Sequence, residues 1–565
     1  MSQVVDTAEQ YFADDRPDLV AELVAEPSGD VPEPLRRSLL AVARIRTGDE
    51  RGEALIDELL PDAGDDATTL SFAAIGLLEV GRNDEAGELV RRAHTADGGD
   101  AVVLRWCDAL KRADRIAEAL TILEAANSGA TLRKRAEFLA AVGQAEAAVE
   151  SLKAAVGSAS PDVRDRVLMA NLAIQLQRYQ DAELNVTKLM QTDGEDPEVS
   201  LLAARLKEIN GDSPAAREIV QTAHDRTPTN VSLAVRRLEL GDATQGVTDQ
   251  VANAVDGQRL GRITLRSAAF ALAQHYDREG DYEKAWHYAK TGNGAYGPGV
   301  ADIGERMKAT FDFASAMQDE VVPTPASEPP ALAYILGAPR SGGTLLQTIL
   351  ARMPGWHSVG ERGALLPYLM DMAQLSASEQ AGRWQEDAAP LRQADLAGLG
   401  SLADAAGFVD KTPHHVYVVG LLAGLYPGAR FIETRRHPLD ELVSIYFRDF
   451  SPSFYYARSP ADIAAYLVDH AAMIRAWRDR GITIVDHDHD AFVADSSGRG
   501  RALFGSLGYD WDDAYLVRGD AEAPVTTFSA GQVTEDVSDA GVGRWKLYES
   551  FLGEAMSHLS ESGLL

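Results

Sequence analysis

The sequence LGAPRSGGTLLQ, residues 336–347, joins an apolar segment to a helical pattern through a glycine-rich turn. The preceding residues 331–336 have the length and composition of a buried strand, and the apolar residues that follow recur at helical spacing up to Leu350. Backbone N–H groups at the start of a helix attract anions. The stretch therefore predicts a strand, an anion-binding loop and a helix.

This loop differs from a nucleoside triphosphate-binding loop at one position. Gly337, Gly342 and Thr344 fit the pattern G-x-x-x-x-G-K-[ST], whose lysine contacts phosphates. Here Gly343 stands at the lysine position, and Arg340 is the only strong cation of the loop. No aspartate ends an apolar strand in an obvious metal-binding role. A kinase or nucleotide triphosphatase with an altered P-loop is therefore a disfavoured alternative.

Length and charge set the broad class of the protein. The 565 residues exceed what one core holds, so two or more domains are expected. The 86 acidic and 54 basic residues give a net charge of -32, which argues against nucleic-acid binding and against a basic membrane-surface footprint. Neither a secretory signal nor an apolar stretch of about 20 residues is visible. We expect a cytoplasmic protein without a membrane span.

Residues 1–315 read as successive helices with a recurring pair of small residues. A glycine or a substitute is followed five residues later by an alanine, at Gly81/Ala86, Asp114/Ala119, Gly143/Ala148, Gln177/Ala182, Gly211/Ala216 and Gly280/Ala285. A period of roughly 34 residues is typical of stacked helix–turn–helix repeats, because small residues let paired helices approach closely. The region resembles a tetratricopeptide repeat array, which implies a concave surface for a peptide or protein partner. A scaffold that only dimerises or caps the other half is the alternative, so a homodimer stays open.

The predicted secondary structure changes after a proline-rich segment. Residues 316–330 contain four prolines and predict an extended linker. From 331 to 565, short apolar segments at 331–338, 407–410, 429–436 and 482–487 alternate with helical stretches, which predicts a parallel sheet covered by helices. The fold class we expect is an all-helical solenoid followed by a P-loop-type α/β domain. Its binding loops should lie at the carboxyl ends of the strands.

Further charged motifs follow the predicted strands. Arg436 comes directly after the segment ARFIETR, and Ser444 lies about two turns into the helix that Pro438 opens. A strand-end arginine beside a helix-borne hydroxyl is a suitable pair for a second phosphate. Glu361 stands in VGERG, 21 residues after Arg340, and residues 526–551 contain a last motif ending in GRWKLYESF.

The order and spacing of these blocks resemble a family. PRSGGTLL, DKTP, YPGARFI, RRHPLD and SIYF follow one another as in sulfotransferases that use 3′-phosphoadenosine 5′-phosphosulfate (PAPS), and the resemblance covers residues 331 to about 556. The position of Glu361 is similar to that of the catalytic carboxylate in the tyrosylprotein sulfotransferase branch. The whole chain looks like a tetratricopeptide array fused to a sulfotransferase domain.

The resemblance implies a role for each matching residue. The 5′-phosphosulfate would be held by the loop residues Arg340, Ser341, Gly342, Gly343 and Thr344. The 3′-phosphate would be held by Arg436 and Ser444, with Arg544 closing over the nucleotide. In the reaction, Glu361 would deprotonate the acceptor, Lys411 and Arg340 would stabilise transferring charge, and Ser529 would hydrogen-bond the sulfate region.

The chemistry needs these residue types. Sulfuryl transfer develops negative charge on the leaving phosphate, so positioned cations and N–H donors are the largest expected contribution, and no metal ion is required. The acceptor hydroxyl also needs a base, for which His414 is the alternative to Glu361. His487 and His489 suggest a metal site, but two histidines without a third ligand favour a helix-capping segment instead, and we expect no metal.

The sequence thus predicts an enzyme that transfers a sulfuryl group from PAPS to a hydroxyl or amine of a peptide, saccharide or small molecule. The repeat array would recruit the substrate or a partner. Gly343 replaces a threonine common in the family's loop, which removes a hydroxyl donor to the phosphate. A binding or scaffold protein with an inactive sulfotransferase-like domain is therefore the alternative.

Overall fold

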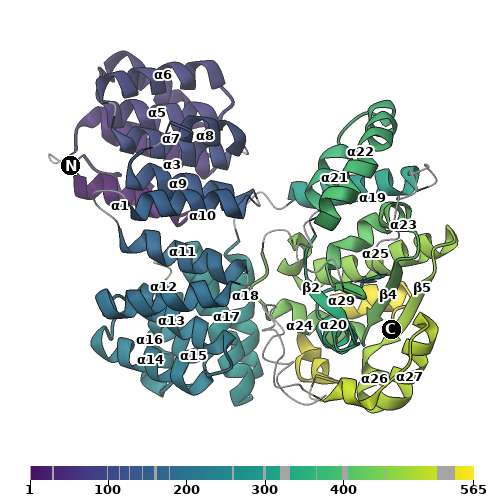
Figure 1. The fold of residues 1–565 in the computed structure, drawn as a ribbon. Coiled ribbons are helices and arrows are strands. Elements are labelled where there is room, and N and C mark those ends of the chain that lie inside the picture. Colours follow the sequence, from purple (N-terminus) through teal and green to yellow (C-terminus); the bar gives the residue numbers. More distant parts are fainter. Residues whose placement is uncertain are drawn as a thin grey trace. The chain divides into compact units, whose positions relative to one another are not determined.

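The alanines of the repeat pattern are all buried where helices pack. In the computed structural model, the side chains of Ala86, Ala119, Ala148, Ala182, Ala216 and Ala285 are each 0% exposed. A larger side chain at these positions would separate the two helices of a repeat. The predicted helical repeat architecture is confirmed, and Figure 1 shows the successive helices of residues 1–268.

Glycine ends the first helix of a repeat in a way that the sequence pattern predicts. At Gly81 the backbone is left-handed, with φ of +83°. The Gly81 N–H donates to the Leu78 carbonyl at 3.1 Å and the Arg82 N–H donates to the Leu77 carbonyl at 2.9 Å. These two bonds close a helix end in the arrangement that favours glycine. The next helix then begins at Asn83 and buries Ala86.

The structure describes residues 2–27, 31–97, 99–113, 115–125, 127–142, 144–157, 162–176, 178–257, 260–296, 301–318, 331–363, 365–397, 405–451, 454–517 and 541–565. Contacts divide the chain into two units, Met1–Ala268 and Ala269–Leu565. The first unit contains α1 (Ser2–Ala13), α2 (Pro17–Leu23), α3 (Glu33–Arg46), α4 (Arg51–Leu59), η1 (Leu60–Asp62), α5 (Ala67–Glu79), α6 (Asn83–Ala96), α7 (Asp100–Arg112), α8 (Ile116–Leu123), α9 (Gly129–Ala141), α10 (Ala145–Val156), α11 (Val163–Gln175), α12 (Tyr179–Thr192), α13 (Pro197–Ile209), α14 (Ser213–Arg226), α15 (Val231–Glu239) and α16 (Gln245–Asp256).

The boundary between the units falls within α17 (Arg262–Glu279). The second unit therefore includes helical residues that the repeat pattern covers, among them α18 (Tyr282–Gly294) and α19 (Ala301–Met317). Most of the predicted linker, residues 319–330, lies outside the described residues, and α19 reaches into its first two positions. The boundaries at 315 and 330 stay predictions.

A five-stranded parallel sheet forms the centre of the second unit. Its strands are β1 (Ala331–Ile335), β2 (Trp356–Gly360), β3 (Gly407–Asp410), β4 (Arg430–Arg435) and β5 (Ile484–Asp488), in the order β2-β3-β1-β4-β5. The predicted α/β class is confirmed. The other elements are α20 (Gly343–Ala351), α21 (Leu366–Met372), α22 (Ala377–Ala397), η3 (Pro413–Val418), α23 (Val419–Leu425), α24 (Pro438–Tyr446), η4 (Tyr455–Arg458), α25 (Pro460–Asp479), α26 (His489–Ala494), α27 (Ser496–Leu507), η5 (Asp513–Leu516), η6 (Arg544–Phe551) and α29 (Gly553–Glu561).

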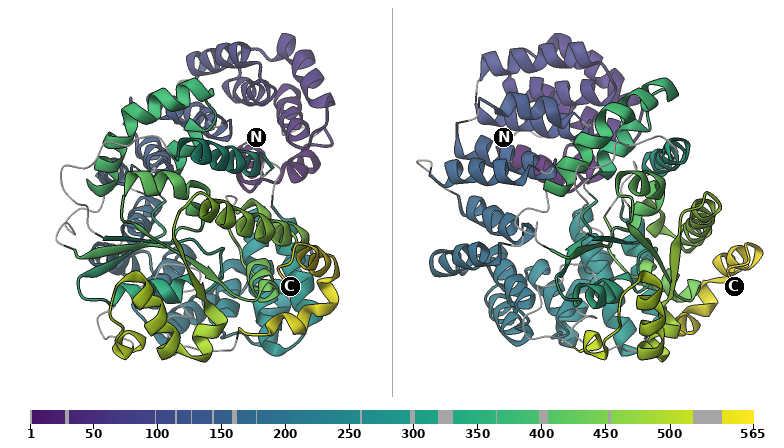
Figure 2. Two further views of the ribbon diagram at one scale, coloured as in Figure 1. Left: turned by 90° about the vertical axis from the view of Figure 1, so that its right-hand side faces the viewer. Right: turned by 45° about the vertical axis from the view of Figure 1, so that its right-hand side comes forward.

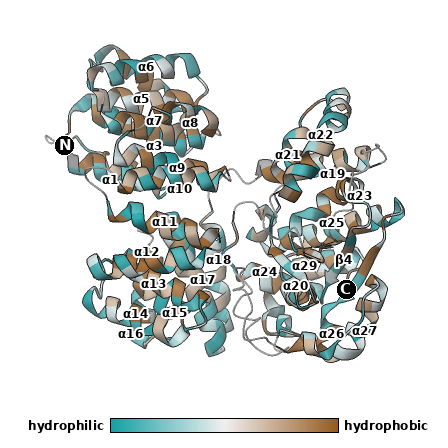
Figure 3. Cartoon of the chain, in the orientation of Figure 1, coloured by the Kyte–Doolittle hydropathy of each residue, from teal (hydrophilic) through white to brown (hydrophobic). Residues whose placement is uncertain are grey.

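Alternate residues of the strands supply two cores, one on each face of the sheet. Leu332 and Tyr334 of β1 pack with α19, α21, α23 and α25, whereas Ala333 and Ile335 pack with α20 and α27. A strand that is buried on both faces reads as a continuous apolar run, which is how residues 331–336 read. Figure 2 shows helices on both sides of the sheet, and Figure 3 shows the hydropathy of each residue along these elements. No helix among the described residues has the length and apolar character needed to span a bilayer.

Candidate active site

The predicted site residues follow the carboxyl ends of neighbouring parallel strands. Arg340 follows β1, Glu361 follows β2, Lys411 follows β3 and Arg436 follows β4. Because β1 has β3 on one side and β4 on the other, the chain reverses its winding there, and loops diverge to leave a crevice. The topology therefore brings these four residues to one edge of the sheet.

The loop after β1 is held in shape by a buried hydrogen bond and two left-handed residues. Ser341 Oγ lies 2.7 Å from Thr434 Oγ1 of β4, and both residues are buried. Arg340 has φ of +72° and Gly342 has φ of +98°. A side chain at Gly337 would place its Cβ 1.8 Å from Thr434 Oγ1. The loop thus needs glycine where it passes β4, and the backbone then turns directly into α20.

We expect Gly342→Ala to destabilise the second unit more than Gly428→Ala does. Both glycines have almost the same backbone, with φ of +98° and +97°, so both variants bear the left-handed penalty of about 1–2 kcal/mol. At Gly342 a Cβ would also lie 2.2 Å from His489 Nδ1, whereas at Gly428 no atom of the described residues would lie within 4 Å of it. The clash should add about 1–3 kcal/mol. Equal falls in the unfolding temperature of the two variants would contradict this packing.

Arg340 connects the loop to α24. Its Nε donates to Ser444 Oγ at 3.0 Å, across 104 residues of sequence. Burial and the neighbouring Arg448, Arg436 and Arg544 lower the pKa of Arg340 to about 9. Burial and the neighbouring positive charges disfavour the charged form of Arg340, and an anion that enters the site would stabilise that charged form. Arg436 Nη1 also donates to the Arg340 carbonyl at 3.5 Å, so the two predicted phosphate-binding regions are joined by hydrogen bonds in both directions.

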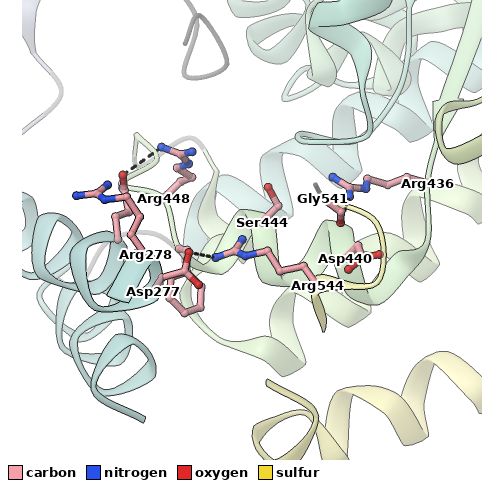
Figure 4. A pocket seen from close by; sticks show the side chains of 10 residues that line it. Asp277, Arg278, Arg436, Asp440, Ser444, Arg448, Gly541 and Arg544 are labelled. Carbon is pink, nitrogen blue, oxygen red and sulfur yellow. Dashed lines mark hydrogen bonds and ion pairs between the residues drawn. The ribbon is translucent and has the colours of Figure 1, made fainter. Parts of the chain in front are cut away.

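A basic pocket of about 290 Å³ lies beside Ser444 (Figure 4). Four arginines and two aspartates are among the residues that line it, together with Gln274, Ser444, Phe447 and Gly541; the charged residues are Asp277, Arg278, Arg436, Asp440, Arg448 and Arg544. All of them belong to the second unit. The excess of guanidinium groups suits a phosphate or sulfate, which arginine can bind through two parallel hydrogen bonds.

Asp440 holds residues 543–545, near the C-terminus, beside this pocket. Its buried carboxylate accepts hydrogen bonds from the backbone N–H groups of Gly543 at 2.7 Å and Trp545 at 2.8 Å. Arg436 Nη2 donates to the Gly541 carbonyl at 2.6 Å. These bonds hold the start of η6, and hence Arg544, against α24. The predicted grouping of Arg436, Ser444 and Arg544 is therefore what the structure has.

Glu361 and Lys411 form an ion pair at the ends of β2 and β3. Lys411 Nζ donates to Glu361 Oε1, and the Lys411 backbone N–H donates to the Gly360 carbonyl at 2.9 Å. The lysine side chain is buried to 10% exposure, while the glutamate is 38% exposed. A carboxylate that faces solvent on one side and a cation on the other is accessible to an incoming hydroxyl group.

Gly343 lies against Lys411 rather than next to an empty space. A Cβ at this position would lie 3.2 Å from Lys411 Cγ and 3.3 Å from its Cδ. The missing threonine therefore leaves room for the stem of the lysine. Glycine at position 343 therefore lacks the hydroxyl donor of a threonine, as the sequence predicts, and it also leaves space for the Lys411 side chain to pack against the loop.

The remaining predicted residues have other environments. His414 is buried, its ring centre lies 4.7 Å from that of Phe454, and burial and His415 lower its pKa to about 4. Asp488 caps α26 by accepting from the Ala491 N–H at 3.0 Å, in agreement with the helix-capping interpretation of this segment.

Among the described residues no cluster of three His, Cys, Asp or Glu is placed to hold a metal. Ser529 lies outside the described residues.

Of the ten residues that line the pocket, sequence reasoning assigned only Arg436, Ser444 and Arg544 to the site and missed the other seven. Arg448 follows Ser444 by four residues, a spacing that would have placed it near the same face. Gln274, Asp277 and Arg278 come from α17, more than 50 residues before β1, and carry no motif of their own. Only the fold brings them to the site.

Comparisons with known proteins agree with this geometry. Residues 333–513 match the sequence model of the sulfotransferase family, a range that contains Arg340, Glu361, Lys411, Arg436 and Ser444. An uncharacterized protein of Aquifex aeolicus (strain VF5) is 26% identical over 360 residues, which is 59% of this chain and 46% of that protein. The chain thus spans about half the length of this curated relative.

Two solved structures are similar to parts of the chain. Yeast Tom70 has 14% identity and a TM-score of 0.34, and the likeness covers 48% of this chain and 62% of Tom70. The sulfotransferase domain of the Synechococcus PCC 7002 olefin synthase has 21% identity and a TM-score of 0.30, over 42% of this chain and 97% of that domain. These scores add nothing to the fold described above. The resemblance of residues 333–513 to sulfotransferases is confirmed, and the tyrosylprotein branch stays a prediction.

Proposed function

We propose that the second unit transfers a sulfuryl group from PAPS to a hydroxyl or amine of an acceptor. The observation that carries this proposal is the hydrogen bond from Arg340 Nε to Ser444 Oγ, which joins a glycine loop to a pocket lined by four arginines. PAPS is an anion at two ends, a 5′-phosphosulfate and a 3′-phosphate. The loop suits the first, and the pocket of about 290 Å³ suits the second.

In this proposal each residue acts on a defined atom. The bond between sulfur and the 5′-phosphate oxygen breaks, and its electron pair stays on that oxygen, where Arg340 and Lys411 stabilise the charge. The acceptor oxygen or nitrogen forms the new bond to sulfur and passes its proton to Glu361. Ser341 already bonds Thr434, so it acts on the loop's shape, while Gly342, Gly343 and Thr344 contribute backbone N–H groups at the start of α20.

The helical repeats support a role in recruiting a protein partner or an extended substrate. The first unit has a hollow of about 1030 Å³ lined by α1, α3, α5, α7, α9 and α11 and by α13 at one end. Its lining includes the aromatic residues Phe12 and Phe72 and the cations Arg105 and Lys134. An extended ligand could therefore make both apolar and charged contacts in this hollow. The acceptor that we propose is accordingly a peptide or another extended molecule, as in the tyrosylprotein branch.

The donor test uses the 3′-phosphate. We expect 3′,5′-ADP, the product that PAPS leaves, to raise the unfolding temperature of the protein, and ATP with Mg²⁺ to leave it unchanged. The reason is that the pocket offers arginines for a terminal phosphate, whereas the loop lacks the lysine that triphosphates need. Stabilisation by ATP with Mg²⁺ but not by 3′,5′-ADP would contradict the proposal and favour the kinase alternative.

A further inference from the structure

One wall of the basic pocket comes from α17, a helix that precedes the α/β part of the chain. Gln274, Asp277 and Arg278 are spaced by three and four residues, so they lie on one face of this helix and all three line the pocket. The opposite wall comes from the end of β4 and from α24. Figure 4 shows the side chains of Arg278 and Arg448 at one end of the hollow and Arg436 at the other.

Asp277 holds the predicted nucleotide-closing residue in place. Arg544 Nη2 lies 2.8 Å from Asp277 Oδ2, and the Tyr548 hydroxyl donates to Asp277 Oδ1 at 2.5 Å. The Arg544 guanidinium also lies 5.4 Å from the ring centre of Phe447. A guanidinium fixed by a carboxylate and an aromatic face has little freedom left to lose when an anion binds.

The pocket keeps an excess of positive charge in spite of this ion pair. The Asp440 carboxylate accepts two backbone N–H groups, and Asp277 is shared between Arg544 and Tyr548. Arg448 Nη1 donates to Gln274 Oε1 at 3.5 Å, and burial together with Arg544 and Arg278 lowers the pKa of Arg448. Four guanidinium groups and two carboxylates line the pocket, and the Asp490 carboxylate lies 3.9 Å from Arg436 Nε, so positive charge is still in excess and favours the binding of a phosphate.

We propose that α17 completes the anion pocket. Arg278 binds the terminal phosphate monoester of the donor nucleotide directly, and Asp277 is a positioning residue that aims Arg544 at the same phosphate. This rests on the proposed function for the identity of the donor, and it goes beyond it because α17 lies outside the part of the chain that matches sulfotransferases. The donor pocket is then incomplete in a chain that starts at β1.

The test compares 3′,5′-ADP with 5′-AMP on the full chain, by isothermal titration. Wild type should bind 3′,5′-ADP more tightly, and Arg278→Ala should weaken 3′,5′-ADP by about tenfold while changing 5′-AMP by less than twofold. Lys290→Ala is the matched control, since it removes an exposed cation from α18 outside the pocket. Arg278 is exposed, so the unliganded unfolding temperature should not fall; if it does, Arg278→Gln gives the same readout.

Asp277→Ala separates positioning from charge. Removing a negative charge alone would strengthen the binding of an anion, whereas loss of the hold on Arg544 would weaken it, so the sign of the change decides. We expect 3′,5′-ADP to bind about fivefold more weakly than in wild type, with 5′-AMP unchanged. Tighter binding would overturn the positioning role of Asp277.

The two proposals fail in different ways. A wild-type protein that binds 5′-AMP as tightly as 3′,5′-ADP would overturn the proposed donor and the role of α17 with it. A wild-type protein that prefers 3′,5′-ADP, with that preference intact in Arg278→Ala and Asp277→Ala, would overturn only the role of α17.

Discussion

Glu361→Gln is expected to lower turnover by about 10²–10⁴-fold and to leave the affinity for 3′,5′-ADP unchanged. Glutamine keeps an oxygen that can accept the Lys411 hydrogen bond, so the ends of β2 and β3 stay joined. It cannot take the proton of the acceptor. The measurement is the rate of 3′,5′-ADP release from PAPS with a panel of phenols, sugar alcohols and a tyrosine-containing peptide, beside a titration with 3′,5′-ADP.

His414→Phe is the variant that tests the alternative base. The histidine is buried against Phe454, and its low pKa makes it neutral at pH 7, so a phenyl ring fills the same apolar place. We expect its turnover to stay within a few-fold of wild type. Full activity of Glu361→Gln together with an inactive His414→Phe would move the base role to the histidine.

Most of the second unit can be predicted because its signals are local. The apolar run before Gly337 is buried on both faces of the sheet, the glycine turn is dictated by the contact with Thr434, and the helix begins where Gly342 allows it. The strands that precede Lys411 and Arg436 are likewise short, and most of their residues are buried. The rule that parallel strands present their carboxyl ends at one edge then groups the residues without further information.

The strand before Glu361 could not be found in this way. Among the described strands, Trp356–Gly360 pairs with β3 alone and lies at the edge of the sheet, and just one of its residues is buried. An edge strand with exposed polar side chains has no apolar run to mark it. The position of Glu361 was therefore predicted from the spacing to Arg340, and its place at a strand end is a finding of the structure.

Contacts between segments that are distant in the chain could not be predicted from the sequence either. The Asp277–Arg544 pair joins residues 267 positions apart, and nothing in either local pattern refers to the other. Repeat periodicity assigns residues around Gly280 to the helical array, yet from Ala269 onward the chain packs with the α/β unit. Repeat periodicity describes how each helix pairs with its sequence neighbours, and it does not show with which unit the last helices of the array pack.

Lys411→Met is the second variant with a large expected effect, a loss of turnover of about 10²–10³-fold. The methionine keeps most of the apolar stem that lies against Gly343, so the change removes the charge more than the packing. The leaving phosphate then loses one of its two stabilising cations, while Arg340 and the basic pocket remain. We therefore expect 3′,5′-ADP to bind within about threefold of wild type, because its 3′-phosphate is held elsewhere.

The control for lost charge is Lys308→Met, which removes an exposed ammonium from α19 and should leave turnover unchanged. Burst and steady-state rates of 3′,5′-ADP release separate the chemical step from product release in each variant. A Lys411→Met protein that keeps its turnover would show that the lysine serves only to hold Glu361. An equal loss in Lys411→Met and Glu361→Gln, with no further loss in the double variant, would instead show that the ion pair acts as one unit, as groups on the same reacting bond do.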